Sequence, residues 1–502
     1  MKTLRRNERV KDYESRPVAG IPPLDANQKA VIAKLGATRE NWHVGADSYD
    51  PLWSHESIEV RYQAGRTLRK KVPRESHVLW SPPGDRPSGA DFVIVGNVGR
   101  QESLVPLRVG RMAASPFSFL RGAASAMAWD LSHTPISGIQ TVIDGDAHIN
   151  NFGLYGTSQR DVVLDLNDFD EAVIGPWEWD LKRLVASVNV AARENGFTRG
   201  ERRFAVMECV SGYIFNLQRL GPMGILDLWS LYAYADRKPK VIKVPRKSWA
   251  LIQKTVEKAR ASHNKTLLTK VARRQANGRW RFLEDPPILT RVDDSTKKKI
   301  IEAMAQYPST LPFGYRNMMQ RYSVADVAHR VVGVGSVGTR AYLVLLFGNG
   351  DDDPLFLQVK EATVPAHAPY LPPLQWKVPH HGLRVIAGQR MLQASGDPLL
   401  GHTRIDDRDY FVRQMKNMKA SMPLEWLVGE PFYFWGFICG GLLARAHSRM
   451  GDAAKIAGYC GKSKVLNEAL AEFAESYGNQ TEQDHASLTK AIREGRVRAM
   501  TG

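Results

Sequence analysis

The chain has few cysteines, fewer acidic than basic residues, and no long apolar run. Its 502 residues include three cysteines, Cys209, Cys439 and Cys460. They are too few and too scattered for a disulfide framework or a cysteine-based zinc site. The most apolar stretch, 431–444, spans 14 residues and contains three glycines, fewer than the ~20 residues needed to cross a bilayer. We therefore expect a buried helix here and no membrane insertion.

The N-terminal segment contains basic residues that no apolar stretch follows, so it lacks the body of a signal peptide. Together with the scarcity of cysteine, this predicts a cytoplasmic protein. No repeat and no low-complexity segment is visible. An apolar content of 43% is that of a folded chain.

Charge is distributed very unevenly along the sequence. The 69 Lys and Arg residues exceed the 52 Asp and Glu residues by 17. Residues 237–299, the basic block, hold 19 basic and 5 acidic residues. Residues 144–180, the acidic segment, hold nine acids and a single base, Arg160. Because these acids are interleaved with apolar, strand-like residues, they indicate a cation site rather than a solvated surface.

Apolar periodicity predicts the main helices and strands. We expect helices at 121–131, 181–195, 443–449 and 464–477, and strands at 139–143, 162–166, 341–347, 355–359 and 410–413. Gly196 is a plausible C-cap of the second helix. The segment 348–354 is predicted to be a hairpin turn.

The first acidic loop, 144–153, follows a predicted strand and contains Asp146, His148 and Asn151. Such an arrangement allows one Asp to face a substrate hydroxyl while Asn and a second Asp hold Mg²⁺, which prefers oxygen ligands. The alternative is that these side chains hydrogen-bond the backbone of a tight turn.

The loop resembles that of the protein-kinase-like superfamily, in particular the aminoglycoside and choline phosphotransferases, which read His-Gly-Asp-x-His-x-x-Asn. Gly145, Asp146, His148 and Asn151 match this motif, and Asp144 replaces its first histidine. The resemblance implies that Asp146 orients or deprotonates the acceptor, that His148 shapes the loop and that Asn151 binds Mg²⁺.

The same resemblance extends to the residues after this loop. The segment 175–181, GPWEWDL, looks like the family's next motif, so Asp180 would be the buried aspartate that hydrogen-bonds the catalytic loop. The metal-binding aspartate would be Asp168 or Asp165, of which we favour Asp168 while retaining Asp165.

A glycine-rich segment and a lysine follow much later in the chain. Gly333, Gly335 and Gly338 have GxGxxG spacing around Ser336, and strand-like residues come after them, which argues against a dinucleotide-binding fold. A glycine turn between strands, followed by a lysine at the end of the next strand, is how kinases cover and bind ATP phosphates. Lys360 has that position. The alternative is a plain hairpin with a surface lysine.

Two features depart from the kinase pattern. No glutamate occurs between Glu361 and Glu425, so the expected helix at 383–393 offers only Gln389 or Gln393 to pair with the lysine. The glycine turn also follows the catalytic loop instead of preceding it. Because circular permutation is tolerated when the termini lie close together at the surface, we predict an α+β, two-lobed, permuted kinase-like fold with added helical segments.

Four longer segments, 111–124, 145–153, 164–184 and 332–346, resemble the bacterial family DUF2252, an uncharacterised family. The resemblance covers about residues 55–490 and implies no established activity.

The basic block also contains aromatic residues, Trp249, Trp280 and Phe282, a composition compatible with nucleic-acid binding. There are two alternatives: the basic block is a solvated helical face, or it steers an anionic substrate toward the cleft. Arg108, Arg111 and Arg121 are further candidates for anion contacts.

The sequence thus predicts an Mg-ATP-dependent phosphotransferase with an unknown hydroxyl acceptor, for which an anionic molecule is a candidate. AMP transfer, a nucleotide-binding pseudoenzyme and a nucleic-acid-binding protein remain open. The expected parts are an N-terminal extension (1–110), a catalytic-loop part (111–225), a basic, mostly helical insertion (226–320), a β-rich part with the glycine turn and the lysine (321–425), and a helical C-terminal region (426–502).

Overall fold

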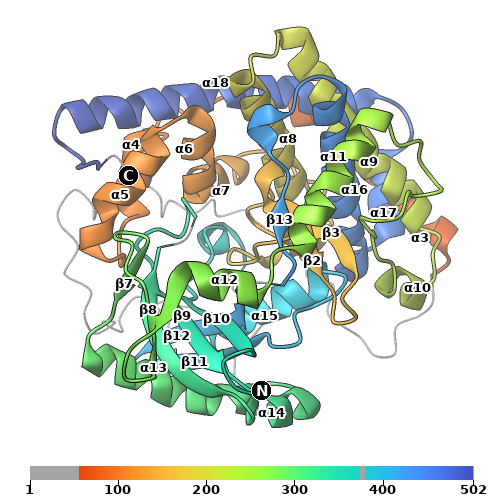
Figure 1. The fold of residues 1–502 in the computed structure, drawn as a ribbon. Helices are drawn as coiled ribbons and strands as arrows, with labels where there is room; N and C mark the ends of the chain where they lie inside the picture. The colour runs from red at the N-terminus through yellow and green to blue at the C-terminus, as the bar shows by residue number, and fades with distance from the viewer. Residues whose placement is uncertain (1–55, 332, 373–378, 416, 501–502) are drawn as a thin grey trace, which may run out of the picture.

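The computed structural model describes residues 56–331, 333–372, 379–415 and 417–500, which form a mixed helix and sheet protein (Figure 1). Half of the expected N-terminal extension, residues 1–55, lies outside the described residues. Figure 1 shows the large sheet with α13 and α14 on one side of the molecule and most of the long helices on the other.

The first half of the described chain alternates helices with short strands. Its elements are α3 (Ile58–Leu68), α4 (Gly89–Val95), α5 (Val105–Ala113), α6 (Pro116–Gly122), α7 (Ala124–Leu131), β1 (Gln140–Ile143), β2 (Phe152–Gly156), β3 (Val162–Leu166), β4 (Val173–Pro176), α8 (Trp177–Glu194), α9 (Arg199–Leu220) and α10 (Ile225–Trp229). The predicted strands at 139–143 and 162–166 are confirmed as β1 and β3. The predicted helix at 121–131 is instead two helices, because Ala123 leaves helical geometry with φ −115° and ψ 47°.

The largest sheet lies in the second half of the chain and is antiparallel throughout. Its strands are β7 (Leu289–Arg291), β8 (Ser323–Arg330), β9 (Ala341–Phe347), β10 (Pro354–Glu361), β11 (Gly401–Ile405) and β12 (Arg408–Gln414), in the order β11-β12-β10-β9-β8-β7. The predicted strands at 341–347, 355–359 and 410–413 and the hairpin between the first two are confirmed.

Residues on β9 alternate between two cores because successive side chains of a strand point to opposite faces. Val344 belongs to the same core as Ile300 of α13 (Asp294–Gln306), and Leu345 to the same core as Leu268 of α12 (Asn264–Val271). A helix therefore covers each face of the sheet.

The residues of the expected, mostly helical insertion at 226–320 form both helices and strands. Beside α11 (Arg246–Arg260), α12, α13 and α14 (Phe313–Met319), it contributes the hairpin of β5 (Ala272–Arg274) and β6 (Trp280–Phe282), and its β7 pairs with β8. It is thus continuous with the large sheet.

The remaining helices are α15 (His381–Leu392), α16 (Glu430–Met450), α17 (Ala453–Cys460) and α18 (Val465–Arg493), and the strand β13 (Ala420–Ser421) pairs with β2. The apolar stretch at 431–444 lies in α16, which packs against α9. At Gly440 a Cβ atom would lie 2.0 Å from the carbonyl oxygen of Cys209, so the close approach of the two helices requires glycine. In the part of the chain that the structure describes, no helix combines the length and apolarity needed to span a membrane.

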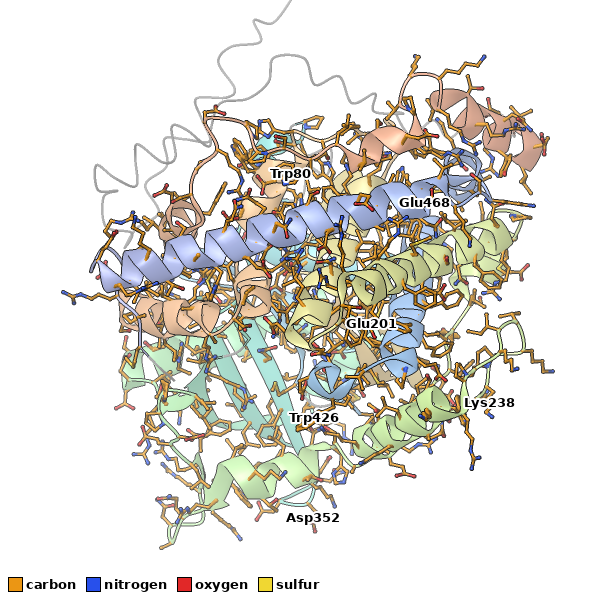
Figure 2. The ribbon with its side chains drawn as sticks, turned by 90° about the horizontal axis from the view of Figure 1, so that it is seen from above. Trp80, Glu201, Lys238, Asp352, Trp426 and Glu468 are labelled. Atoms are coloured by element: carbon orange, nitrogen blue, oxygen red, sulfur yellow. The ribbon has the colours of Figure 1, made fainter. Side chains whose placement is uncertain are left out.

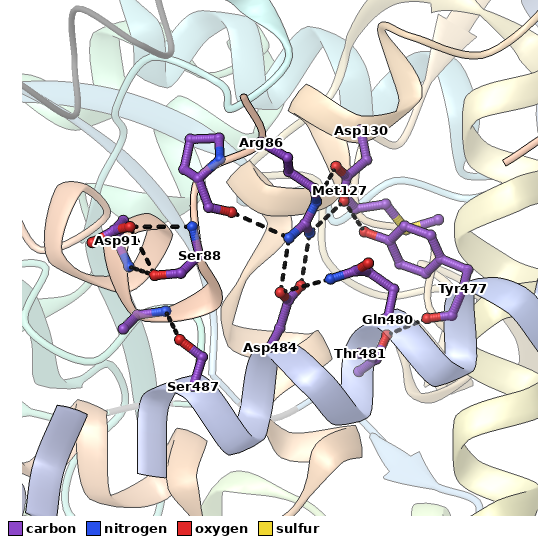
Figure 3. A network of polar contacts seen from close by, with 12 residues as sticks. Arg86, Ser88, Asp91, Met127, Asp130, Tyr477, Gln480, Thr481, Asp484 and Ser487 are labelled. Atoms are coloured by element: carbon purple, nitrogen blue, oxygen red, sulfur yellow. Dashed lines mark hydrogen bonds and ion pairs between the residues drawn. The ribbon is translucent and has the colours of Figure 1, made fainter. Parts of the chain in front are cut away.

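A buried ion-pair network joins α18 to α7 and the segment before α4 (Figure 3). The Arg86 guanidinium donates to Asp130 at 2.7 and 2.8 Å and to Asp484 at 2.8 and 2.7 Å. Tyr477 Oη donates to Asp130 at 2.8 Å. Since bidentate, buried pairs of this kind fix geometry, the network holds the α4–α7 region in place, and this region forms one wall of the site described next.

Candidate active site

A cavity of about 750 Å³ lies where the loop after β1, the end of the acidic segment, the glycine turn between β8 and β9, and β10 meet. Most of the residues predicted from the sequence line it: Arg121, Asp146, His148, Asn151, Asp168, Gly333, Gly335, Ser336 and Lys360. Asp165, Asp180, Gly338 and Arg111 are not among its lining residues. The cavity therefore brings together stretches that lie far apart in the sequence.

The loop after β1 is held from beneath by the first turn of α8. Asp180 accepts hydrogen bonds from the backbone amides of Asp144 (2.6 Å) and Gly145 (2.9 Å), and His447 Nε2 lies 3.1 Å from the same carboxylate. Gly145 has φ +78°, and a Cβ atom there would lie 2.4 Å from the carbonyl oxygen of Glu171, so no other residue fits. Asp180 thus makes the loop contacts that the resemblance implied.

Asp146 faces the cavity with one carboxylate oxygen already bound. Its Oδ1 accepts hydrogen bonds from Arg183 Nε (3.0 Å) and Nη2 (2.7 Å), while Oδ2 lies 3.9 Å from His148 Nε2. Burial raises the pKa of Asp146 to about 7 although Arg183 opposes this effect. Arg183 was not identified from the sequence, but it lies three residues after Asp180 on α8, where i,i+3 neighbours share a face.

The other two residues of this loop have structural contacts as well. Asn151 Nδ2 donates to the backbone carbonyl of Asp146 at 2.8 Å, so Asn151 does stabilise the turn. Its side-chain oxygen accepts no hydrogen bond from the described residues. Burial, with Arg121 and Arg183 nearby, lowers the pKa of His148 well below its usual range. His148 is therefore a neutral imidazole that packs edge-on against Phe117.

Lys360 is not a surface lysine. Its side chain is 2% exposed, its ammonium binds the Asp170 carboxylate, and Asp168 Oδ1 is 4.0 Å away. Burial opposes ionisation of Asp168, but Lys360, Arg413 and Lys419 outweigh this effect and lower its pKa. Burial and the adjacent Asp168 raise the pKa of Asp170. The acidic segment and the strand-end lysine thus meet directly.

Asp165 has a different environment from Asp168. It is fully buried on β3, where its carboxylate pairs with Arg445 and accepts hydrogen bonds from the amides of Leu166 and Ala394, both at 2.9 Å. Asp168 Oδ1, by contrast, is buried without a hydrogen-bond partner among the described residues. Of the two aspartates, only Asp168 lines the cavity.

The helix expected to pair with the lysine is present as α15, but its glutamines point elsewhere. Gln389 Nε2 donates to Gln393 Oε1, and Gln393 Nε2 donates to the Leu166 carbonyl. Neither is recorded in contact with Lys360. Arg384 instead connects α15 to the acidic segment and to the chain after β10. It donates to the carbonyl oxygens of Asp170 (2.7 Å), Ala172 (2.7 Å) and Thr363 (2.9 Å).

The glycine turn between β8 and β9 lines the cavity through Gly333, Gly335 and Ser336. The Ser336 and Thr339 amides donate to carbonyls within the turn, and Gly338 has φ +89°. Arg100 Nη1 donates to the Val337 carbonyl at 2.7 Å, and the Gln101 amide donates to the Gly338 carbonyl at 2.8 Å. The turn is therefore held in place by the segment between α4 and α5.

The three arginines singled out for anion contacts differ. Arg121 lines the cavity, and within the described residues it makes no hydrogen bond or ion pair; its guanidinium lies 5.9 Å from the Phe117 ring centroid. Arg108 also lines the cavity, but it donates to Asn97 Oδ1 and to the Gly122 carbonyl. Arg111 is half-buried outside the cavity lining.

The donor set of the cavity suits a hard cation bound together with a phosphate. Across the described ranges, no group of three or more His, Cys, Asp or Glu side chains is arranged to hold a metal ion by itself. Magnesium at phosphate sites uses one or two carboxylates and takes its other ligands from phosphate and water. Asp168 Oδ1 accepts no hydrogen bond from the described residues, although Arg413 Nη1 lies 3.8 Å and Lys360 Nζ 4.0 Å away. This oxygen and the side-chain oxygen of Asn151 are ligands of the kind that magnesium binds.

The chain belongs to the family described as an uncharacterized protein conserved in bacteria, DUF2252, whose family model matches residues 100–491. No curated protein and no solved structure matches the chain.

Proposed function

We propose that this protein is an Mg-ATP-dependent phosphotransferase that transfers the γ-phosphoryl group to a hydroxyl acceptor in the 750 Å³ cavity. The observation that carries the proposal is the contact of Lys360 with Asp170 and Asp168. Lys360 and Asp170 are 190 positions apart in the sequence. A phosphate-binding cation and a metal-binding carboxylate are needed within reach of the same triphosphate, and these side chains meet that need.

The order of elements supports a permuted, two-lobed kinase-like fold as part of this proposal. The chain runs from β8 through the glycine turn to β9, from β9 to β10 with Lys360 at its end, and through α15 to β11 and β12. Kinases likewise place the glycine loop before the strand that carries the lysine. The loop with Asp146 precedes this unit in the sequence, and α16 follows it.

Asp146 is the proposed general base. Since Arg183 holds Oδ1, Oδ2 is the oxygen that accepts the proton of the acceptor hydroxyl. A base is most effective when its pKa lies near the working pH, and the pKa of about 7 fits that condition.

Asn151 and Asp168 are the proposed magnesium ligands, and Lys360 and the backbone of 333–338 the proposed phosphate contacts. When bound, Mg²⁺ would neutralise the charge of the phosphate oxygens. Asp165 is already paired with Arg445, so Asp168 is the better candidate. We expect Asp168→Asn to raise the Mg²⁺ concentration required for nucleotide binding at least tenfold. Asp165→Asn should destabilise the fold and leave that requirement unchanged, and titration of Mg²⁺ at fixed ATP distinguishes the two variants.

The decisive experiment is to incubate the purified protein with Mg²⁺, cell extract and ATP labelled in either the γ or the α phosphate. Label from γ-ATP alone, lost in the Asp146→Asn variant, supports phosphoryl transfer. Label from α-ATP indicates AMP transfer instead. Thermal stabilisation by Mg-ATP without any transfer would identify a pseudoenzyme. Absence of both binding and transfer would refute the proposal.

Nucleic-acid binding through residues 237–299 is a separate proposal with less support from the contacts. Lys297 pairs with Asp326 and Lys299 with Asp406, so part of the positive charge is already neutralised. Its test is salt-dependent retention of DNA or RNA that is indifferent to Mg-ATP and lost when residues 297–299 are neutralised.

A further inference from the structure

A second cavity, of about 340 Å³, lies between α9, α11, α16 and the segment 231–244. Aromatic side chains form much of its wall: Phe215, Tyr232, Tyr234, Trp249, Phe434 and Phe437. Aliphatic side chains, Ile252 and Ile438 among them, complete it. Its volume lies within the usual range of small-molecule sites, which are mostly apolar with a few polar groups.

Three cationic side chains that line this apolar cavity, Lys238, Lys240 and Arg219, form no ion pair within the described residues. Lys238 and Lys240 are exposed lining residues, and no ion pair is recorded for either in the described parts of the chain. The Lys238 ammonium lies 5.5 Å from the Trp249 ring centroid, at the boundary between the aromatic wall and solvent. Lys238 lies on the surface of the molecule in Figure 2. Arg219, another lining residue, donates to Asn216 Oδ1 and pairs with no carboxylate of the described residues.

The combination restricts what the cavity can bind. A small hydrated anion would lose its water against the aromatic wall without compensation. A neutral apolar molecule would gain nothing from the two exposed lysines, whereas an anionic head group would contact them. Nucleic acid is disfavoured because the aromatic side chains line a pocket rather than an extended groove that follows a backbone.

We propose that this cavity binds an anionic single-chain amphiphile, with its hydrocarbon chain against the aromatic wall and its carboxylate or phosphate head at Lys238 and Lys240. The proposal is independent of phosphoryl transfer, because none of these residues lines the cavity with Asp146.

Calorimetric titration of the full chain with decanoate, dodecanoate, decyl phosphate and decanol, below their micelle concentrations, tests the proposal. Each added methylene should lower Kd roughly fourfold until the cavity is filled. Decanol should bind at least tenfold more weakly than decanoate. Comparison of decanoate with decyl phosphate identifies the preferred head. Equal affinity for decanol and decanoate, or no dependence on chain length, would overturn the assignment.

Paired variants separate a built site from general attraction to a basic surface. Lys238→Gln with Lys240→Gln should weaken decanoate binding at least tenfold. Lys254→Gln with Lys258→Gln removes the same charge from exposed positions of α11 outside the cavity lining, and should change Kd less than twofold. Ile438→Trp, which fills the cavity, should abolish binding. Equal losses in the two lysine pairs, or binding to phosphatidylglycerol vesicles without binding of free decanoate, would contradict the proposal.

Discussion

The acidic segment at 144–180 and the basic block at 237–299 carry net charges of opposite sign, and their charged side chains differ in burial. Asp165 and Asp180 are fully or almost fully buried and bind guanidinium, imidazole or amide groups. Arg260 in the basic block pairs with Asp236 while its side chain remains 55% exposed. Charge density by itself therefore does not identify a site. The informative charges are buried groups that line a cavity with an oxygen or a nitrogen unsatisfied.

The largest effect is expected at Asp146. Asp146→Asn keeps the size of the side chain but removes the proposed base, so the proposed phosphoryl transfer should fall up to about 10⁴-fold with nucleotide affinity nearly unchanged. Single-turnover transfer from γ-labelled ATP and equilibrium binding of ATP measure the two quantities.

A control for this variant lies in the same acidic segment. Asp161 pairs with exposed Arg237 and is not among the residues that line the cavity. Asp161→Asn should transfer phosphate at a rate within about twofold of that of the wild type. Equal losses at Asp146 and Asp161 would mean that the cavity has no special role.

The second largest effect is expected in the network of Figure 3. The Arg86 side chain is 5% exposed and compensates two carboxylates. Arg86→Ala leaves both without a counter-charge and should lower the free energy of unfolding by about 3–5 kcal/mol. Arg86→Lys keeps the charge but cannot form both bidentate contacts, so it should lower the free energy of unfolding less than Arg86→Ala does. Denaturant unfolding of the three proteins measures these differences. If the free energy of unfolding of Arg86→Ala were within 1 kcal/mol of that of the wild type, the buried ion pairs would not stabilise the fold as this comparison assumes.

A smaller effect is expected in the pH dependence of transfer. The pKa of Asp146 is raised to about 7, so the basic form predominates above that pH, and transfer should rise as the pH increases through 7. In the folded state this carboxyl also binds a proton more readily than in the unfolded chain, so it lowers stability as the pH rises from about 4 to 7.

Burial raises the pKa of Asp146, and Arg183 limits that rise. Because the guanidinium favours the carboxylate, Arg183→Gln should move the midpoint of the activity profile upward by about one pH unit or more, equivalent to ~1.4 kcal/mol. Arg183→Lys should shift it less. A midpoint that stays in place or moves downward would contradict the pairing of Arg183 with the base.

Periodicity and turn chemistry predicted much of the local structure. The strands at 341–347, 355–359 and 410–413 follow from apolar, β-branched runs, and the end of α8 follows from Gly196. The family resemblance indicated Asp146 and Asp180 because each lies in a short motif, although Asp180 binds backbone amides 35 and 36 positions away. The strand patterns, the helix end and the motifs themselves are local, so a single sequence contains them.

Long-range pairings could not be predicted in the same way. Asp170 was included in the acidic segment, but nothing in its neighbourhood indicates that it, rather than a helix glutamate, meets Lys360. In the sequence, Arg183 and Arg384 have the pattern of ordinary helix residues. Their contacts are with carboxylate and carbonyl groups that only the tertiary fold brings near. The different environments of Asp165 and Asp168 could not be predicted either, because Arg445, which pairs with Asp165, lies 280 residues away from it.

The smallest effect is expected in the basic block. Arg260 Nη2 lies 2.7 Å from Asp236 Oδ2, a good distance, yet solvent screens the pair and the free side chain loses entropy when it is held there. Arg260→Ala should therefore change the free energy of unfolding by less than about 0.5 kcal/mol, and added salt should reduce even that difference. Denaturant unfolding at low and high salt measures it. A loss comparable to that of Arg86→Ala would show that exposed pairs in this block also hold the fold together. The contrast between inward acids and outward bases would then no longer separate the site from the surface.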